Sequence, residues 1–173
     1  MNNISHAKES GTSMIEVIVT IIVISIGILG LGGLQITSMK YQKTAGQRAE
    51  ATQSAYDLSE RMRANGTGVS LDRYVYTTAY ATTVANLPSI PACSTSICTP
   101  LEVAEIDKAE WLRNLATRLS GGAGYVISNG VGAYDLVVMW KEPNYAGIDP
   151  ACPSGVAPAP GDAVRCFVVR FTP

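Results

Sequence analysis

The side chains that most often carry catalysis or bind metals are scarce in this sequence. The only histidine is His6, which lies in the polar segment MNNISHAKESG. Removal of that segment would leave no histidine, which excludes histidine-based catalytic triads and zinc sites with imidazole ligands. No stretch matches the phosphate-binding pattern GxxxxGK[ST], and the GGAG at 121–124 is typical of a helix end followed by a turn. We therefore expect no enzyme activity, no cofactor and no metal site.

The four cysteines are the remaining reactive groups, and their spacing favours disulfides. They follow the patterns C-x4-C and C-x13-C, which lack the close pairs of zinc ribbons. Four cysteines allow three pairings, and the sequence alone does not choose among them. We favour Cys93 with Cys98 and Cys152 with Cys166, because each pair brackets a loop rich in proline or glycine. A bridge that closes a loop of about 15 residues stabilises a fold by about 3 kcal/mol.

The charge balance argues against nucleic acid as a partner. The chain of 173 residues has 13 basic and 14 acidic side chains, for a formal net charge of -1. Proteins that bind nucleic acids usually show a basic face or stripe. The length and the 47% hydrophobic content suit one folded domain with an extension.

One segment near the N-terminus is apolar enough to cross a membrane. No charged residue occurs from Val17 to Met39, and a helix of about 23 residues spans a hydrocarbon core of about 30 Å. The apolar part of a secretory signal is shorter, at about 7–15 residues. Because the polar leader precedes this run, we expect any processing to fall between the two.

Two observations disagree about the orientation of this membrane helix. The N-terminal flank carries only Lys8, whereas the C-terminal flank carries three cations, so the positive-inside rule places the C-terminal side in the cytoplasm. These three are Lys40, Lys43 and Arg48. All four cysteines lie on that same side, and disulfides require an oxidising compartment. We follow the cysteines, because long downstream domains are translocated largely regardless of flanking charge.

The helical pattern continues beyond the apolar run, up to Asn65. Asp57 with Arg61 and Glu60 with Arg63 have the spacing of helical ion pairs. Gly66 then predicts the helix end, since glycine accepts the left-handed backbone that follows many helices. The result is one helix of about 50 residues, on the order of 80 Å long. Four residues form its apolar stripe: Ala51, Ala55, Leu58 and Met62.

The remaining chain predicts an α+β domain. We expect an extended or loosely structured segment, a loop, a second helix, and an antiparallel sheet of at least three strands. The second helix carries Trp111, Leu115 and Leu119 along one side and ends at the glycines that follow. The expected ranges are 73–84 for the extended segment, 87–100 for the loop, 100–120 for the helix, 124–128, 134–141 and 164–171 for the strands, and 144–162 for a further loop.

The glycines of the apolar run allow two interpretations. Gly27, Gly30 and Gly33 recur every three residues, with Gly32 beside them. Membrane helices tolerate glycine more often than soluble helices do. Alternatively, the helix packs closely against other helices along this side, or unwinds there.

Glu16, at the start of the apolar run, also has two explanations. The segment from Ser13 to Glu16 fits the capping-box pattern S/T-x-x-E, and a carboxylate near a helix N-terminus is favoured by about 0.3–1 kcal/mol. In the alternative, the chain is cut after Gly11, and the new amino group of Thr12 meets the Glu16 carboxylate of a neighbouring subunit. Breaking such a buried pair costs about 3–5 kcal/mol.

The stretch GTSMIEVIV resembles the class III signal of type IV prepilins, in which a short polar leader ends in glycine and glutamate is the fifth residue of the mature chain. Other stretches resemble PilV-type minor pilins in the same order: SIGILGLGGLQ at 25–35, AYDLSERMRANG at 55–66, EWLRNLATRLSGGAG at 110–124 and LVVMWKE at 136–142. The resemblance covers most of the chain.

This resemblance implies a type IV pilin-like fold, with a long N-terminal helix on a small antiparallel sheet and one additional helix. A prepilin peptidase would cut between Gly11 and Thr12 and methylate the new amine, and Glu16 would be an assembly contact. Thr12 stands where such proteins usually carry phenylalanine, and the leader is less basic than usual. The implied parts are a leader at 1–11, a transmembrane half of the helix at 12–39, an amphipathic half at 40–66 and a globular head at 67–173.

The resemblance also implies a function in type IV pilus assembly. Similar proteins join other minor pilins and the major pilin through the inner-membrane assembly machinery, prime the fibre and present a tip adhesin, which supports adhesion and twitching motility. The expected location is the bacterial inner membrane with the head in the periplasm, and then the extracellular pilus tip. Two alternatives stay open: a pseudopilin of a type II secretion system, and a membrane-tethered module that binds surfaces.

Overall fold

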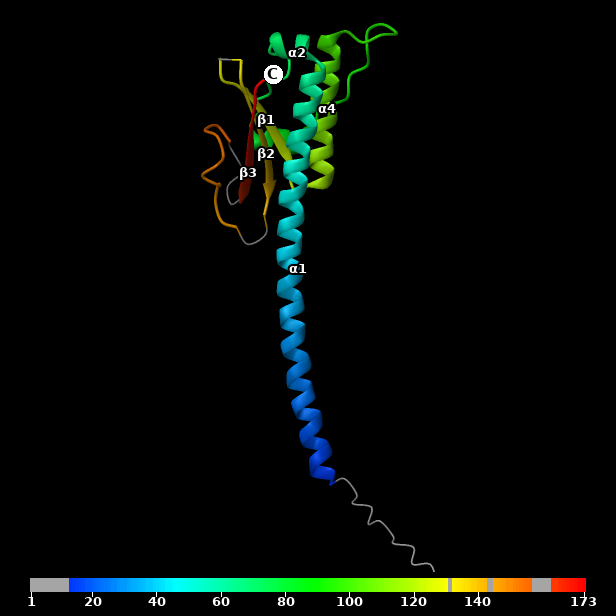
Figure 1. The fold of residues 1–173 in the computed structure, drawn as a ribbon, viewed down its shortest axis with the longest axis vertical. Coiled ribbons are helices and arrows are strands. Elements are labelled where there is room, and N and C mark those ends of the chain that lie inside the picture. Colours follow the sequence, from blue (N-terminus) through cyan, green and yellow to red (C-terminus); the bar gives the residue numbers. More distant parts are fainter. Residues whose placement is uncertain (1–12, 131, 143–144, 157–162) are drawn as a thin grey trace, which may run out of the picture. The chain divides into compact units, whose positions relative to one another are not determined.

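The computed structural model describes residues 13–130, 132–142, 145–156 and 163–173 (Figure 1). These residues fall into two compact units, one ending at Lys43 and one running from Thr44 to Pro173. Helix α1 (Met14–Ala64) contributes residues to both. Its buried residues all belong to the second unit and begin at Gln47.

The second unit combines helices with one small sheet. Strands β1, β2 and β3 pair antiparallel in the order β1-β2-β3, so that each strand lies beside the next one along the chain. This arrangement confirms the predicted fold class, a long N-terminal helix on a small antiparallel sheet, although the described residues contain the short helices α2 and α3 besides the one additional helix that was predicted. The elements after α1 are α2 (Gly66–Ser70), α3 (Tyr80–Ala85), α4 (Pro100–Arg118), β1 (Ala123–Ser128), β2 (Tyr134–Lys141) and β3 (Val164–Phe171).

Helix α4 lies beside the C-terminal turns of α1 in the second unit (Figure 1). The predicted apolar stripe of α1 is confirmed, because all four of its residues are fully buried. The two alanines in the stripe let the neighbouring elements approach α1 closely, and the indole of Trp111 on α4 donates a hydrogen bond to the carbonyl of Ser54 at 2.9 Å. The helix pair is therefore joined by both apolar packing and a buried hydrogen bond.

Both faces of the sheet are covered. One face carries Leu136, Val138 and Trp140 of β2, and these residues share a core with α1 and α4. The opposite face carries Val137 and Met139, which pack with residues outside the two long helices. That second core consists of Tyr80, Ala123, Tyr125, Val137, Met139, Val156, Val164 and Cys166.

The predicted role of Gly66 is wrong. The glycines with positive φ lie elsewhere, and Gly66 is the first residue of α2. Asn65 is the N-cap of α2, and its side chain accepts a hydrogen bond from the amide of Gly68 at 3.1 Å. The chain therefore turns after α1 through the side chain of an asparagine, and not through a left-handed glycine.

The prediction of an extended segment at 73–84 is wrong in its second half. Tyr76 does form an isolated antiparallel bridge with Val126 of β1, but Tyr80–Ala85 is helix α3. Tyr80 is 1% exposed, and its hydroxyl donates to the carbonyl of Gly121 at 2.6 Å. Burial of this aromatic ring against the sheet outweighs the preference of Tyr, Thr and Val for strands.

Candidate assembly site

The first unit presents an apolar surface with no cover inside the chain. All of its isoleucines, leucines, valines and methionines from Met14 to Met39 are exposed. The most apolar stretch of α1 is entirely unburied, and this helix is long and apolar enough to cross a membrane. An exposed apolar surface of this extent requires a hydrocarbon phase or other helices around it.

Three of the polar side chains in the apolar half of α1 (residues 14–39) form hydrogen bonds within the helix itself. Three hydroxyls donate to carbonyls three or four residues earlier, so none of them needs an external acceptor. These bonds run from Thr20 to Val17 at 2.8 Å, from Ser25 to Ile21 at 2.7 Å and from Thr37 to Gly33 at 3.0 Å. These three hydroxyls are therefore compatible with a hydrocarbon environment.

The glycines of the apolar half have no role inside this chain. A Cβ atom added at Gly27, Gly30, Gly32 or Gly33 would meet no heavy atom within 4 Å. The helix also stays continuous through them, so it does not unwind there. If these positions need glycine, the requirement comes from a neighbour outside the chain.

Glu16 carries the only charge between Ser13 and Met39. The amide of Glu16 donates to the backbone carbonyl of Ser13 at 2.9 Å. Within the part of the chain that the structure describes, the Ser13 hydroxyl and the Glu16 carboxylate form no capping box and no ion pair. The predicted cleavage pair, Gly11 and Thr12, lies outside the described residues. The assembly contact of Glu16 stays a prediction.

In the second unit, Arg61 of α1 links α1 to α4 through ion pairs. Its guanidinium donates to Asp107 at 3.1 Å and to Glu110 at 2.8 Å, both on α4, and to Asp57 on its own helix at 3.1 Å. Asp107 in turn accepts a hydrogen bond of 2.6 Å from the Tyr74 hydroxyl. The predicted pair of Asp57 with Arg61 is confirmed, and so is that of Glu60 with Arg63.

A second charged cluster joins α1 to the sheet and to the loop before β3. Arg165 of β3 donates to Glu142 at 3.1 Å and to Asp149 at 2.8 Å, and it lies over the ring of Tyr145 at 3.8 Å from the centroid. Arg48 of α1 reaches Glu142 at 3.3 Å. Each charge of the cluster has a partner of opposite sign, which suits a structural role.

The structure contains the two disulfides that the sequence analysis favoured, Cys93–Cys98 and Cys152–Cys166. Their Cα atoms lie 5.0 and 5.1 Å apart. The second bridge attaches the loop before β3 to β3 itself. The first closes six residues just before α4, which we call the disulfide ring (residues 93–98). The ring therefore leads directly into the N-terminus of a helix.

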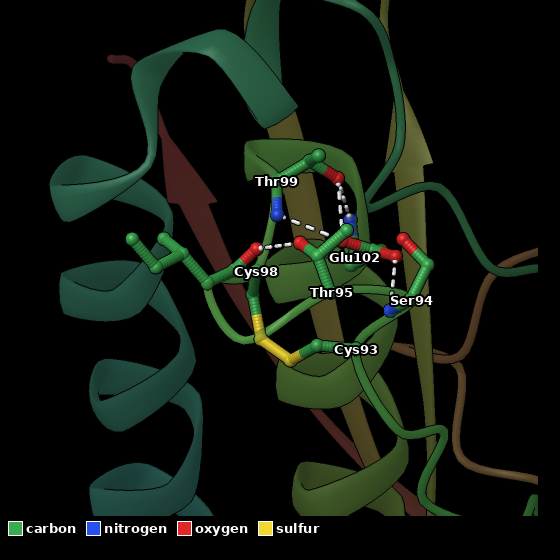
Figure 2. The surroundings of a disulfide bond; sticks show 7 residues. Cys93, Ser94, Thr95, Cys98, Thr99 and Glu102 are labelled. Carbon is green, nitrogen blue, oxygen red and sulfur yellow. Dashed lines mark hydrogen bonds between the residues drawn. A yellow bond between two sulfur atoms is a disulfide. The ribbon is translucent and has the colours of Figure 1, made fainter.

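The disulfide ring is held by Glu102 in the first turn of α4 (Figure 2). The carboxylate accepts from the amide of Ser94 at 2.8 Å, from the amide of Thr99 at 2.8 Å and from the Thr99 hydroxyl at 2.9 Å. Thr99 also caps α4, which completes a capping box. The hydrogen bonds from Ser94 and Thr99 lower the pKa of Glu102 to about 2, so this carboxylate is ionised at neutral pH.

The described residues hold no group of three or more histidine, cysteine, aspartate or glutamate side chains that fits a metal ion. One open cavity of about 310 Å³ lies where α2 meets the turn between β1 and β2. At this cavity, the Tyr134 hydroxyl donates to Asp72 at 2.7 Å. Burial is the larger cause and this hydrogen bond the smaller one, and together they raise the pKa of Tyr134 to about 12. The Tyr134 hydroxyl therefore stays protonated at neutral pH. Its bond to Asp72 attaches the start of β2 to the chain that follows α2.

Sequence reasoning missed two residues that position the head. Glu102 had a readable signal, since TPLE at 99–102 fits the capping-box pattern S/T-x-x-E. Asparagine is a common N-cap, but no sequence signal indicated that the Asn65 amide donates to the Tyr74 hydroxyl at 3.1 Å and to the carbonyl of Pro100 at 2.7 Å. Only the folded chain brings these groups together.

Comparison with known proteins gives one family match. The model of the Tt1218-like family, described as type IV pilin Tt1218, matches residues 33–109. No curated protein and no solved structure gave a match. The matched region runs from the apolar half of α1 through the disulfide ring into α4. The match supports a place in the type IV pilin superfamily, and the fold is consistent with it.

Proposed function

We propose that this protein is a minor pilin of the PilV type, which joins other minor pilins and the major pilin in the inner membrane and then lies at the pilus tip. The family match supports a pilin role in a type IV pilus. The observation that carries the proposal is the half helix whose apolar residues are all exposed and whose single charge is Glu16. Such a surface suits a helix that moves from a bilayer into a bundle of similar helices.

The assignment to minor pilins rests on the PilV-like stretches at 25–35, 55–66, 110–124 and 136–142. The second of them contains Leu58, Arg61 and Asn65, and the third contains Trp111. These residues are the ones that join α1 to α4 and α1 to α2. The resemblance thus falls on the residues that build the head, beyond the N-terminal signal that all type IV pilins share.

The decisive experiment is intact-mass measurement and N-terminal sequencing of the protein recovered from sheared pili. We expect a chain that begins at Thr12, with both disulfides formed and a methyl group on the new amine. Replacing Gly11 with tryptophan should leave the full-length precursor in the membrane, because the peptidase requires the glycine. A shortened product from that variant would contradict the proposed cleavage.

Deletion of the gene for this protein distinguishes a minor pilin from a pseudopilin of a type II secretion system. Loss of pili and of twitching motility, with secretion intact, is the expected result. Loss of secretion with normal pili would favour the pseudopilin. Binding of surfaces by the purified protein in the absence of pili would favour the membrane-tethered module. We propose that the protein has no enzyme activity and does not bind nucleic acid.

A further inference from the structure

Two asparagines of this chain directly precede a glycine, and the fold places them in different surroundings. They are Asn65, followed by Gly66, and Asn129, followed by Gly130. Asparagine is chemically labile in proteins, because the nitrogen of the next backbone amide can attack its side-chain carbonyl. Glycine in the next position leaves that nitrogen uncovered, since it has no Cβ. The folded structure therefore decides which of the two asparagines can react.

Asn129 lies just after β1, in the turn that leads to β2, and both Asn129 and Gly130 are exposed. The backbone amide of Asn129 donates to the carbonyl of Ala133 at 2.9 Å, which closes the turn. The backbone amide of Gly130 donates to no group among the residues that the structure describes. The nitrogen that would attack Asn129 is therefore free in the folded protein.

A single hydrogen bond restrains the side chain of Asn129. Its amide nitrogen donates to the carboxylate of Asp135 on β2 at 3.0 Å, and this contact is exposed to solvent. An exposed hydrogen bond of this kind contributes little net free energy, because water replaces it when it breaks. Rotation of the Asn129 side chain toward the Gly130 nitrogen therefore costs little.

The side chain of Asn65, in contrast, is buried and uses both of its polar groups. Its oxygen accepts from the amide of Gly68 at 3.1 Å, and its nitrogen donates to the Tyr74 hydroxyl at 3.1 Å and to the carbonyl of Pro100 at 2.7 Å. The residue is 9% exposed. Rotation toward Gly66 would leave several buried polar groups without partners, which is costly. The fold therefore protects Asn65.

We propose that Asn129 is a site of spontaneous deamidation in the folded protein, and that Asn65 is protected from this reaction. The Gly130 nitrogen loses its proton and forms a bond to Cγ of Asn129. The bond from Cγ to Nδ2 breaks, and the side-chain amide group leaves with the proton as ammonia. Water then opens the resulting succinimide ring at either carbonyl, which gives aspartate or isoaspartate. The net reaction consumes water and releases ammonia, so it requires neither an enzyme nor an oxidant.

The reaction changes the charge where the turn meets the sheet. Asp135 pairs with Arg170 of β3 through two hydrogen bonds, at 2.8 and 3.0 Å. The product replaces the amide donor of Asn129 with a second carboxylate beside Asp135, and like charges repel each other. The turn thereby loses its side-chain link to β2, and isoaspartate also lengthens the backbone of the turn by one carbon atom.

The test incubates the full-length protein in detergent at neutral pH, in water enriched in heavy oxygen. Peptide mapping by mass spectrometry measures the acid formed at each asparagine, and the incorporated heavy oxygen identifies product that formed during the incubation. We expect acid to form at least tenfold faster at residue 129 than at residue 65. In denaturant, the two sites should react at similar rates, because the protection of Asn65 requires the fold.

Two variants check the chemistry. Asn129→Gln should slow the reaction at this position at least tenfold, because the longer side chain must close a larger ring, although it keeps an amide that can donate to Asp135. Gly66→Ala is the control, because a Cβ at Gly66 meets no heavy atom within 4 Å. It should leave the rate at residue 129 unchanged.

The proposal is overturned if residue 129 remains an amide throughout, or if both asparagines react at the same rate in the folded protein. It is also overturned if Asn65 stays at least tenfold slower in denaturant, because the local sequence and not the fold would then set the difference. Recovery of the chain from sheared pili tests the pilin role separately, so the modification and the proposed function can fail independently of each other.

Discussion

Glu102 links the charge state of one carboxyl group to the order of the disulfide ring. Three donors, from Ser94 and Thr99, converge on its two oxygens. Each of these bonds is to an ionised acceptor, and such bonds are shorter and stronger than neutral ones. The order of the ring should therefore depend on pH even though the ring lies at the surface.

Acid should loosen the ring through Glu102. The pKa of this carboxyl is about 2 in the folded chain, below the ordinary value of 4.5, so its contribution is fully present above about pH 4.5 and is lost as the pH falls toward 2. We expect the amides of Ser94 and Thr99 to exchange hydrogen faster over that window, after correction for intrinsic exchange rates. Glu102→Gln should exchange fast already at pH 7, and an acid response equal to that of the wild type in this variant would contradict the assignment.

Two glycines in α2 should respond differently to the same substitution. A Cβ at Gly68 would lie 2.6 Å from the side-chain nitrogen of Asn65 and 3.1 Å from the ring of Tyr74, whereas a Cβ at Gly66 would meet nothing within 4 Å. Gly68→Ala should therefore destabilise the head by about 1–3 kcal/mol, and Gly66→Ala should change it by less than about 0.5 kcal/mol. Thermal unfolding of both variants in detergent measures the difference, and equal effects would show that Asn65 and Tyr74 move aside without cost.

At the scale of elements, the pairing of α1 with α4 depends on the indole of Trp111. The head has two buried tryptophans, and they differ in one respect. Trp111 donates to Ser54, while the indole N–H of Trp140 has no acceptor among the described residues. Both rings are almost completely buried, at 1% and 3% exposed, so the two sites form a matched pair.

Replacing each tryptophan with phenylalanine should separate hydrogen bonding from packing. Both variants lose similar apolar contacts, but only Trp111→Phe leaves the Ser54 carbonyl without its donor. We expect Trp111→Phe to cost about 1–2 kcal/mol more than Trp140→Phe in chemical unfolding. The reverse order would mean that packing at Trp140 outweighs the hydrogen bond.

The elements with strong periodic patterns could be predicted from the sequence. The strands at 134–141 and 164–171 and the start of α4 at Pro100 are confirmed, because short runs rich in β-branched and aromatic residues, the apolar stripe and proline act locally. Helix α3 and the contact of Asn65 with the start of α4 could not, because each depends on a group far away in the chain. Tyr80 needs Gly121, and Asn65 needs Pro100.

The features of the candidate site also separate into those that the local sequence predicts and those that depend on the folded chain. Glu16 and the apolar run could be found from composition alone, since one carboxylate in an aliphatic stretch stands out without any fold. The support of the disulfide ring by Glu102 could have been read from TPLE, whereas the burial of Asn65 could not, because burial is a property of the folded chain.

At the scale of the whole molecule, the two units have different requirements. The second unit has a buried apolar core of its own and pairs its charged clusters within itself. The first unit leaves its apolar residues exposed and depends on its surroundings for cover. A chain of this kind needs two environments, and the proposed function supplies both, the bilayer before assembly and a bundle of helices after it.

Glu16→Ala should leave processing intact and reduce entry into the fibre. In the proposed bundle, the carboxylate pairs with the free amino terminus of a neighbour, and loss of one partner of a buried pair costs about 3–5 kcal/mol. Immunoblots of sheared fibres and membranes should show processed chain that stays mostly in the membrane. Thr20→Ala is the control, because its hydroxyl bonds only within its own helix. Fibre entry of Glu16→Ala at the level of this control would contradict the assembly contact.

The internally bonded hydroxyls of the apolar half have a thermodynamic consequence for transport. Thr20, Ser25 and Thr37 keep their hydrogen bonds in any low-dielectric medium, so transfer of this segment from lipid to protein leaves none of these three donors unmatched. Their contribution to the partition between the two media is then small. Glu16 is the one charged group of this segment, and a fibre that supplies a partner for its carboxylate would shift the partition toward the fibre.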